Sequence, residues 1–221
     1  MAKIKTSKLI EGYDIYSPLV LRFYDLFVLA FSNRFLWKCP KKELVSLYNR
    51  NVTDDHLDIG VGTGYYLSVA RFPSSHPHVT LVDRNINSLS MAARRIEHLK
   101  PSIVLADVMY DLPLVKNYSS VSMCYLLHCL SGGIKIKSQV FDRVSTVLKD
   151  GGRVFGATIV PDHKELNYVA RPVLKLYNKI GIFSNIEDTM EDLKIEFEKR
   201  FSNSQLQRVG SVVLFEGIVR K

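Results

Sequence analysis

Cysteine, tryptophan and long apolar runs are scarce in this chain of 221 residues. The three cysteines, Cys39, Cys124 and Cys129, form no Cys-x-x-Cys pair, which argues against a disulfide framework and a metal site. The most apolar stretch, residues 19–31, contains two charged side chains, so neither a signal peptide nor a membrane-spanning helix is expected. An odd number of cysteines without a secretory leader predicts a reducing compartment and therefore a cytoplasmic location.

Charge of one sign is not concentrated either, since no block of five like charges occurs. The net charge is +8, and +5 of it belongs to residues 1–50. This thin excess provides no basic stripe for a polyanion, which argues against a nucleic-acid partner. With 47% apolar and 24% charged residues the composition is that of an ordinary globular protein, and the length fits one α/β domain.

The middle of the chain alternates between strand and helix patterns. Short runs of apolar residues predict strands at His56–Ile59, Val79–Asp83, Ile103–Ala106, Val121–Leu127 and Arg153–Val160. Amphipathic patterns predict helices between them at Gly64–Arg71, Asn87–Lys100 and Ile134–Leu148. Strands joined by helical crossovers predict a parallel, doubly wound sheet with helices on both faces.

The C-terminal part departs from this alternation. Two helical patterns, at residues 165–178 and 188–200, precede two predicted strands, Ser204–Arg208 and Val212–Val219. Only three residues join these strands, and so short a connection permits only an antiparallel hairpin. The sequence therefore predicts a Rossmann-like α/β sheet of seven strands that is mostly parallel, with a C-terminal antiparallel hairpin and N-terminal helices.

A glycine-rich turn follows the first predicted strand. Residues 57–64 read Leu-Asp-Ile-Gly-Val-Gly-Thr-Gly, and without side chains the glycines let backbone amides approach a ligand closely. The next strand ends in Asp83, whose carboxylate suits the two hydroxyls of a ribose. A dinucleotide site prefers Gly-x-Gly-x-x-Gly, whereas Asp58, just before these glycines, repels a pyrophosphate and attracts a cationic methionine moiety. The pattern favours S-adenosylmethionine over NAD.

Together these features resemble the class I S-adenosylmethionine-dependent methyltransferases over roughly residues 50–221. Besides the glycine turn and Asp83, the resemblance is carried by Leu-Ala-Asp-Val at 105–108, Tyr-Leu-Leu-His-Cys-Leu at 125–130 and Leu-Lys-Asp-Gly-Gly-Arg-Val at 148–154. It implies an enzyme that transfers a methyl group from S-adenosylmethionine and leaves S-adenosylhomocysteine. It further implies cofactor contacts from Asp58, Gly60, Gly62, Thr63, Gly64, Asp83, Arg84, Asp107, Val108 and Leu126.

Two of the residues so implied have an alternative role. In the family, Asp107 hydrogen-bonds the adenine amino group, but an aspartate at this position also suits a local turn before Met109. His128 lies at the C-terminal edge of the fourth predicted strand, where ligands of open α/β sheets bind, and is a candidate base or orienting group for the acceptor. The alternative is a histidine that bonds a backbone group at the strand end. Because methyl transfer depends mainly on alignment, a base is optional.

The methyl acceptor is expected to be a small molecule of specialised metabolism that reacts through oxygen, nitrogen or sulfur. Residues 1–50 are interpreted as a helical cap over the substrate, and residues 51–221 as the cofactor-binding domain. The candidate acceptor contacts, for which ordinary core packing is the alternative, are Tyr13, Tyr16, Tyr24, Asn33, Trp37, His128, Tyr177, Asn178 and Phe183. An RNA or protein methyltransferase, a non-catalytic cofactor-binding protein, and the choice between monomer and homodimer stay open.

Overall fold

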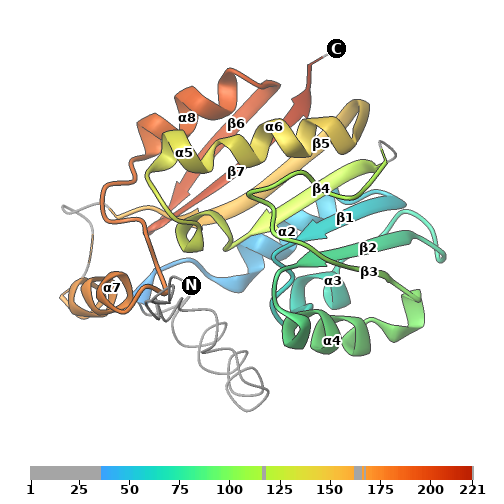
Figure 1. Cartoon of the computed structure of the whole chain (residues 1–221), viewed down its shortest axis with the longest axis horizontal. Helices are drawn as coiled ribbons and strands as arrows, with labels where there is room; N and C mark the ends of the chain where they lie inside the picture. Colours follow the sequence, from blue (N-terminus) through green and yellow to red (C-terminus); the bar gives the residue numbers. More distant parts are fainter. Residues whose placement is uncertain (1–35, 116–117, 162–165, 167, 221) are drawn as a thin grey trace, which may run out of the picture.

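The computed structural model describes residues 36–220, except 116–117, 162–165 and 167 (Figure 1). Its strands are β1 (Asp55–Ile59), β2 (His78–Asp83), β3 (Ser102–Leu105), β4 (Tyr118–Cys124), β5 (Leu148–Ile159), β6 (Phe201–Val209) and β7 (Val212–Val219). Within these residues they form one sheet in the order β3-β2-β1-β4-β5-β7-β6. The first five strands run parallel, and β7 pairs antiparallel with both β5 and β6. The predicted seven-stranded sheet and its terminal hairpin are confirmed.

The helices divide between the two faces of this sheet (Figure 1). One face carries α2 (Lys41–Asn51), α3 (Tyr65–Val69), α4 (Ile86–Arg95) and α7 (Ala170–Lys179). The other carries α5 (Ile134–Lys137), α6 (Gln139–Val147) and α8 (Met190–Glu198). Successive side chains of β5 alternate between them, since Val154 packs on the α6 side and Phe155 on the α2 side.

Several of the predicted boundaries are wrong; the fourth strand, predicted over Val121–Leu127, is Tyr118–Cys124. The helix predicted over residues 134–148 consists of two helices, α5 and α6, that meet at Ser138, whose hydroxyl bonds back to the carbonyl of Lys135. The helix predicted from residue 165 begins only at Ala170. The strand predicted from Arg153 begins at Leu148, so residues 149–152 lie inside β5, next to an irregular register between β4 and β5.

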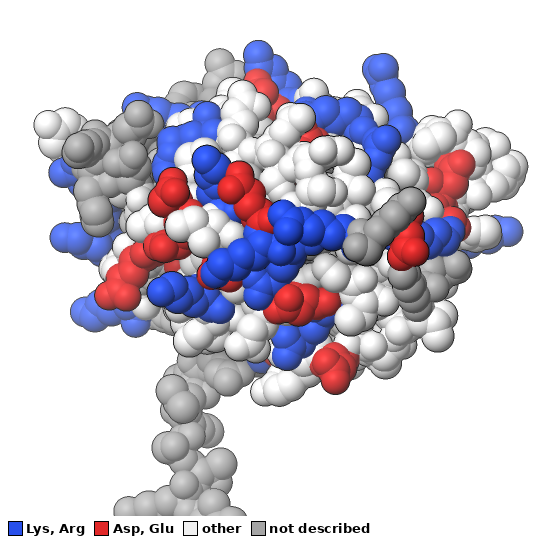
Figure 2. Space-filling view, turned by 90° about the horizontal axis from the view of Figure 1, so that it is seen from above, with Lys and Arg blue, Asp and Glu red and all other residues white. Residues whose placement is uncertain are grey.

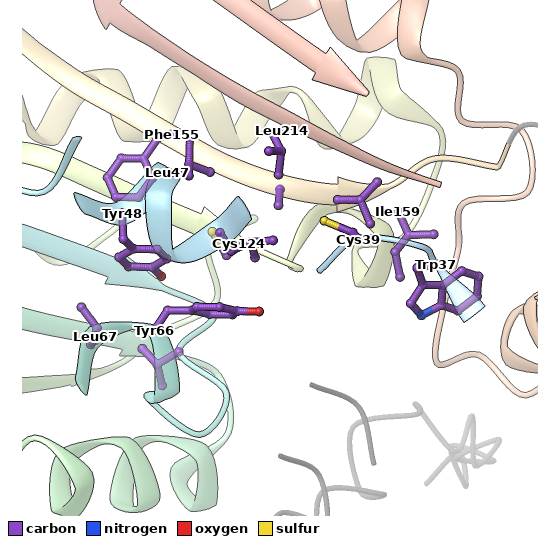
Figure 3. Packing of buried hydrophobic residues seen from close by; sticks show 14 of the residues in the cluster. Trp37, Cys39, Leu47, Tyr48, Tyr66, Leu67, Cys124, Phe155, Ile159 and Leu214 are labelled. Atoms are coloured by element: carbon purple, nitrogen blue, oxygen red, sulfur yellow. The ribbon is translucent and has the colours of Figure 1, made fainter. Parts of the chain in front are cut away.

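The described part of the N-terminal region belongs to the core of the sheet domain. Leu44 and Leu47 of α2 are fully buried against β5 (Figure 3). Upstream of α2, Trp37 is 2% exposed, and its carbonyl accepts the N–H of Ser211 at 2.8 Å. Residues 36–51 are therefore packed onto the sheet, and residues 1–35 lie outside the described part of the chain.

Charged side chains are interspersed on the face that bears α6 and α8 (Figure 2). Arg200 contacts Asp142 of α6 at 2.7 Å and Glu196 of α8 at 2.8 Å. The two cations beside Glu196, Lys199 and Arg200, hold the pKa of its carboxyl at about 2. The basic excess of the chain is thus balanced locally here by acidic partners. Among the described residues, no helix is long and apolar enough to cross a membrane.

Candidate active site

The glycine turn between β1 and α3 has the conformation for which glycine is needed. Gly60, Gly62 and Gly64 adopt φ values of +74°, +51° and +72°, a region that other L-residues rarely enter. A Cβ on Gly62 would meet nothing within 4 Å, so the backbone faces open space at this point. A Cβ on Gly64 would lie 2.8 Å from the Cα of Ala92 in α4. Gly64 therefore allows close packing, whereas Gly62 leaves room for a ligand.

An open cavity lies beside this turn, at the carboxyl ends of β1, β2 and β4. The empty space there, including open solvent at its mouth, is about 1020 Å³. Eight of the ten predicted cofactor contacts line it: Gly60, Gly62, Thr63, Asp83, Arg84, Asp107, Val108 and Leu126. Thr63 is itself fixed by Arg95 of α4, whose Nη1 donates to the Thr63 hydroxyl at 3.0 Å.

Asp83 presents a carboxylate to this cavity from the end of β2. Burial raises the pKa of Asp83 to about 6, although nearby backbone amides, including those of Asn85 and Gly62, favour its charged form. The N–H of Asn85 donates to it at 2.8 Å. Asp83 is therefore mostly charged at neutral pH and offers a strong hydrogen-bond acceptor to a hydroxylated ligand.

Asp107 has the local turn that the sequence offered as one of its two roles, and it also lies in the cavity wall, where the adenine role stays a prediction. Its Oδ1 accepts the N–H of Met109 at 2.9 Å, which is the predicted local turn. Its Oδ2 lies 3.3 Å from Nη1 of Arg84. Asp107 and Arg84 also both line the cavity. The turn thus holds the aspartate at the cavity wall.

Asp58 and Gly64 do not line the cavity. Strand alternation points the side chain of Asp58 toward α2, where it is 3% exposed. There it accepts the Tyr48 hydroxyl at 3.0 Å and the Ser122 hydroxyl. Burial raises the pKa of Asp58 to about 6, against the effect of these two hydrogen bonds. Asp58 therefore ties β1 to β4 and α2 behind the glycine turn.

His128 has the second of the two environments that the sequence allowed. Its Nδ1 accepts the backbone N–H of Ile159 at 3.3 Å and lies 3.3 Å from the Thr158 hydroxyl. The side chain is buried, and burial, with a smaller contribution from Lys137, lowers the pKa of His128 to about 3. The imidazole is therefore neutral and does not line the cavity.

Four predicted acceptor contacts meet in one aromatic cluster. The ring of Phe183 lies 4.5 Å from that of His128, 5.0 Å from Tyr177 and 6.1 Å from Trp37, measured between centroids. The ring of Tyr125, which lines the cavity, lies 5.9 Å from His128. Residues far apart in the sequence thus form a largely buried cluster of rings, which contacts the cavity wall through Tyr125. We call Trp37, His128, Tyr177 and Phe183 the aromatic cluster.

The other predicted acceptor contacts are Asn178 and four residues near the N-terminus. Asn178 exchanges hydrogen bonds with Asn185 at 2.9 and 3.0 Å, so its amide is used to hold the loop after α7. Tyr13, Tyr16, Tyr24 and Asn33 lie outside the described residues.

Several cavity residues were missed in the sequence: Tyr65, Tyr66, Asn85, Ser88, Ala106, Cys124, Tyr125, Cys129 and Leu130. Most of them directly adjoin a predicted contact along the chain. Extending each motif by one or two residues finds these neighbours, because the strand ends and turns that carry the motifs also form the cavity wall. Cys129 belongs to the motif at residues 125–130 and Cys124 directly precedes it, and nothing else in the sequence indicated that these two cysteines line the cavity.

The comparisons with known proteins agree with this geometry. Residues 57–156 match the family described as a methyltransferase domain. The demethylluteothin O-methyltransferase of Streptomyces thioluteus is 37% identical to this chain over 206 residues, which cover 93% of this chain and 90% of that protein. The physcion biosynthesis cluster O-methyltransferase of Aspergillus chevalieri is 36% identical and covers 96% of both.

A solved structure shows the same fold. The N-methyltransferase NodS of Bradyrhizobium japonicum, in complex with S-adenosylhomocysteine, aligns with a TM-score of 0.58 over 81% of this chain and 85% of its own, at 12% identity. The chain belongs to the S-adenosylmethionine-dependent methyltransferases of class I. It is therefore an enzyme that transfers methyl groups, and the NAD and binding-protein alternatives are set aside.

Proposed function

We propose that this methyltransferase methylates a hydroxyl oxygen of a small aromatic or conjugated molecule in specialised metabolism. The observation that carries the proposal is the aromatic cluster beside the cofactor cavity, because flat rings pack well against aromatic side chains. The choice of oxygen is supported by relatives named as O-methyltransferases that match nearly the full chain.

We propose one orientation of the cofactor in this cavity. Asp83 would accept the ribose hydroxyls and Asp107 the adenine amino group, with Val108 beside the adenine ring and Leu126 beside the sulfonium. The open space at Gly62 admits the methionine part. The bound cofactor supplies an activated methyl carbon, and the protein aligns the acceptor with it and excludes water.

Replacing Asp83 by asparagine is expected to weaken S-adenosylhomocysteine binding about 10- to 100-fold, because hydrogen bonds to a charged group are lost. Since the pKa of Asp83 is about 6 in the free protein, wild-type affinity should fall as the pH drops through this value and the carboxylate is protonated. The variant should lack this dependence. Calorimetric titration with S-adenosylhomocysteine at several pH values measures the affinity and its pH dependence for wild type and variant.

Asp111→Asn, at a fully exposed side chain, is the matched control and should behave like wild type. Equal affinities for wild type and Asp83→Asn would refute the placement of the ribose hydroxyls at Asp83.

For His128 we propose an orienting role. Its ring holds Phe183 in the aromatic cluster, and with a pKa of about 3 it is a weak base. His128→Asn is therefore expected to lower kcat/KM while leaving the shape of its pH profile unchanged between about pH 5 and 9. Loss of one limb of the profile in the variant would instead identify His128 as the base.

We also propose that residues 1–50 supply part of the acceptor site, with Tyr13, Tyr16, Tyr24 and Asn33 as contacts. The support is positional: the described chain begins at Leu36, next to Trp37 of the aromatic cluster. A small-molecule acceptor accounts for this site better than RNA or protein does. We propose that the enzyme acts as a monomer or as a homodimer.

The acceptor atom is tested with three naphthalene compounds that differ only in that atom, and with demethylluteothin as a further hydroxyl compound. The enzyme is incubated with methyl-labelled S-adenosylmethionine and 2-naphthol, 2-naphthalenethiol, 2-naphthylamine or demethylluteothin. We expect label in the hydroxyl compounds, as methyl ethers. Label in the sulfur or nitrogen product instead, or in none of the four, would contradict the proposal.

A further inference from the structure

Tyr125 has a backbone conformation that is costly for an aromatic residue. It follows β4 directly and adopts a φ of +61°, with its N–H donating to the carbonyl of Ala157 at 2.7 Å. Bulky residues rarely enter this region, and residues that do so cluster at functional sites. Of the four described non-glycine residues with positive φ, Tyr125 alone lines the cofactor cavity.

The burial of the Tyr125 hydroxyl is a second feature that costs folding free energy. The hydroxyl oxygen is buried and has no nitrogen or oxygen partner among the described residues. Its hydrogen-bonding neighbour is the buried thiol of Cys39, and sulfur is a weak partner that leaves most of the cost of burying the hydroxyl in place. Burial, with smaller contributions from Tyr66 and Cys39, raises the pKa of Tyr125 well above its usual value of 10. The phenol is therefore protonated at neutral pH and has a proton to donate.

The position of Tyr125 links the two halves of the site. Its ring lines the cofactor cavity and lies 5.9 Å from the ring of His128. His128 in turn contacts Phe183, at the centre of the aromatic cluster. The side chain thus stands at the boundary between the residues that hold the cofactor and those proposed to hold the acceptor, where the methyl group must cross.

We propose that the hydroxyl of Tyr125 donates a hydrogen bond to the acceptor oxygen and selects phenols and enols, which react as oxygen anions. This inference rests on the proposed function. The acceptor releases its proton to bulk solvent as it binds, and its oxygen then forms a bond to the methyl carbon while the carbon–sulfur bond breaks. The electron pair of that bond stays on sulfur, which becomes a neutral thioether. A donor beside the oxygen stabilises the anion and so increases the fraction of acceptor that is ionised in the site.

The variant Tyr125→Phe tests this role, since it keeps the ring and removes only the hydroxyl. With 2-naphthol or demethylluteothin, whichever the wild type methylates faster, we expect kcat/KM at neutral pH to fall about 10- to 100-fold. The pH at half-maximal kcat should rise by about one unit, because the bound acceptor ionises less readily. Affinity for S-adenosylhomocysteine should not change. Thermal stability should stay equal or rise, because a buried hydroxyl with only a weak partner is removed.

Tyr118→Phe is the matched control. Tyr118 lies at the opposite end of β4, where its hydroxyl donates to Thr80 at 3.1 Å. This variant should keep the wild-type kcat/KM and pH profile. The inference would be overturned if Tyr125→Phe kept the wild-type kcat/KM and pH profile, or if it lost stability with an unchanged profile, as for a structural hydroxyl. If the wild type itself labelled no hydroxyl acceptor, the proposed function would fail instead.

Discussion

Replacement of Lys137 by methionine is expected to lower the free energy of unfolding by about 3–5 kcal/mol. The Lys137 side chain is 1% exposed, and its Nζ contacts Oδ2 of Asp188 at 2.5 Å and the carbonyl of Ser184. Without the ammonium group, the carboxylate of Asp188 stays buried without a counter-charge. Its Oδ1 already has no partner among the described residues.

The pH dependence of this loss has a definite sign. Burial already raises the pKa of Asp188, and removal of Lys137 raises it further. A group whose pKa is raised in the folded state favours folding at low pH and opposes it as the pH rises through that pKa. The loss should therefore be smaller in acid than at neutral pH. Urea denaturation at two pH values measures it.

The double variant Lys137→Met, Asp188→Leu is the control. It replaces the buried pair by apolar side chains and should recover most of the lost stability. A single variant as stable as wild type would show that the pair is not a buried ion pair. The pair also has a link to function, because Ser184 donates its N–H to the carbonyl of His128 at 2.8 Å, next to Phe183. The single variant should therefore also loosen the aromatic cluster.

The second large effect concerns Gly64. Gly64→Ala is expected to cost about 2–4 kcal/mol of stability, the sum of an unfavourable φ and a clash with the backbone of α4. Gly62→Ala is the matched control, since it has positive φ but open space around its Cβ, and should cost only about 1–2 kcal/mol. Chemical denaturation compares the two variants. Equal losses would show that Gly64 does not pack against α4.

Local signals were sufficient for the fold. The three glycines at residues 60–64 predicted a turn after the first strand, and each of them adopts a positive φ there. The three-residue connection before Val212 permitted only a hairpin, and β6 and β7 form one. These predictions succeeded because each depends on the conformation of a few neighbouring residues.

Features that depend on distant partners were not predictable in the same way. The orientation of Asp58 depends on Ser122, 64 residues away, and the burial of Lys137 depends on Asp188, 51 residues away. The positive φ of Tyr125 has no signal in the residue itself, because tyrosine rarely adopts it. His128 was predicted directly after the fourth strand, but β4 ends at Cys124 and His128 lies in a short 3-10 helix, Leu127–Cys129. Its hydrogen bond to Ile159 and its low pKa follow from burial by the surrounding elements.

The central claim is that one cavity holds the cofactor, with its ribose at Asp83 and its sulfur toward Tyr125 and the aromatic cluster. A crystal structure with S-adenosylhomocysteine bound tests it most directly. The account predicts the ribose hydroxyls within hydrogen-bond distance of Asp83, the adenine beside Asp107 and Val108, and the sulfur facing the Tyr125 ring. Density for the cofactor outside this cavity, or in the reverse direction within it, would contradict the account.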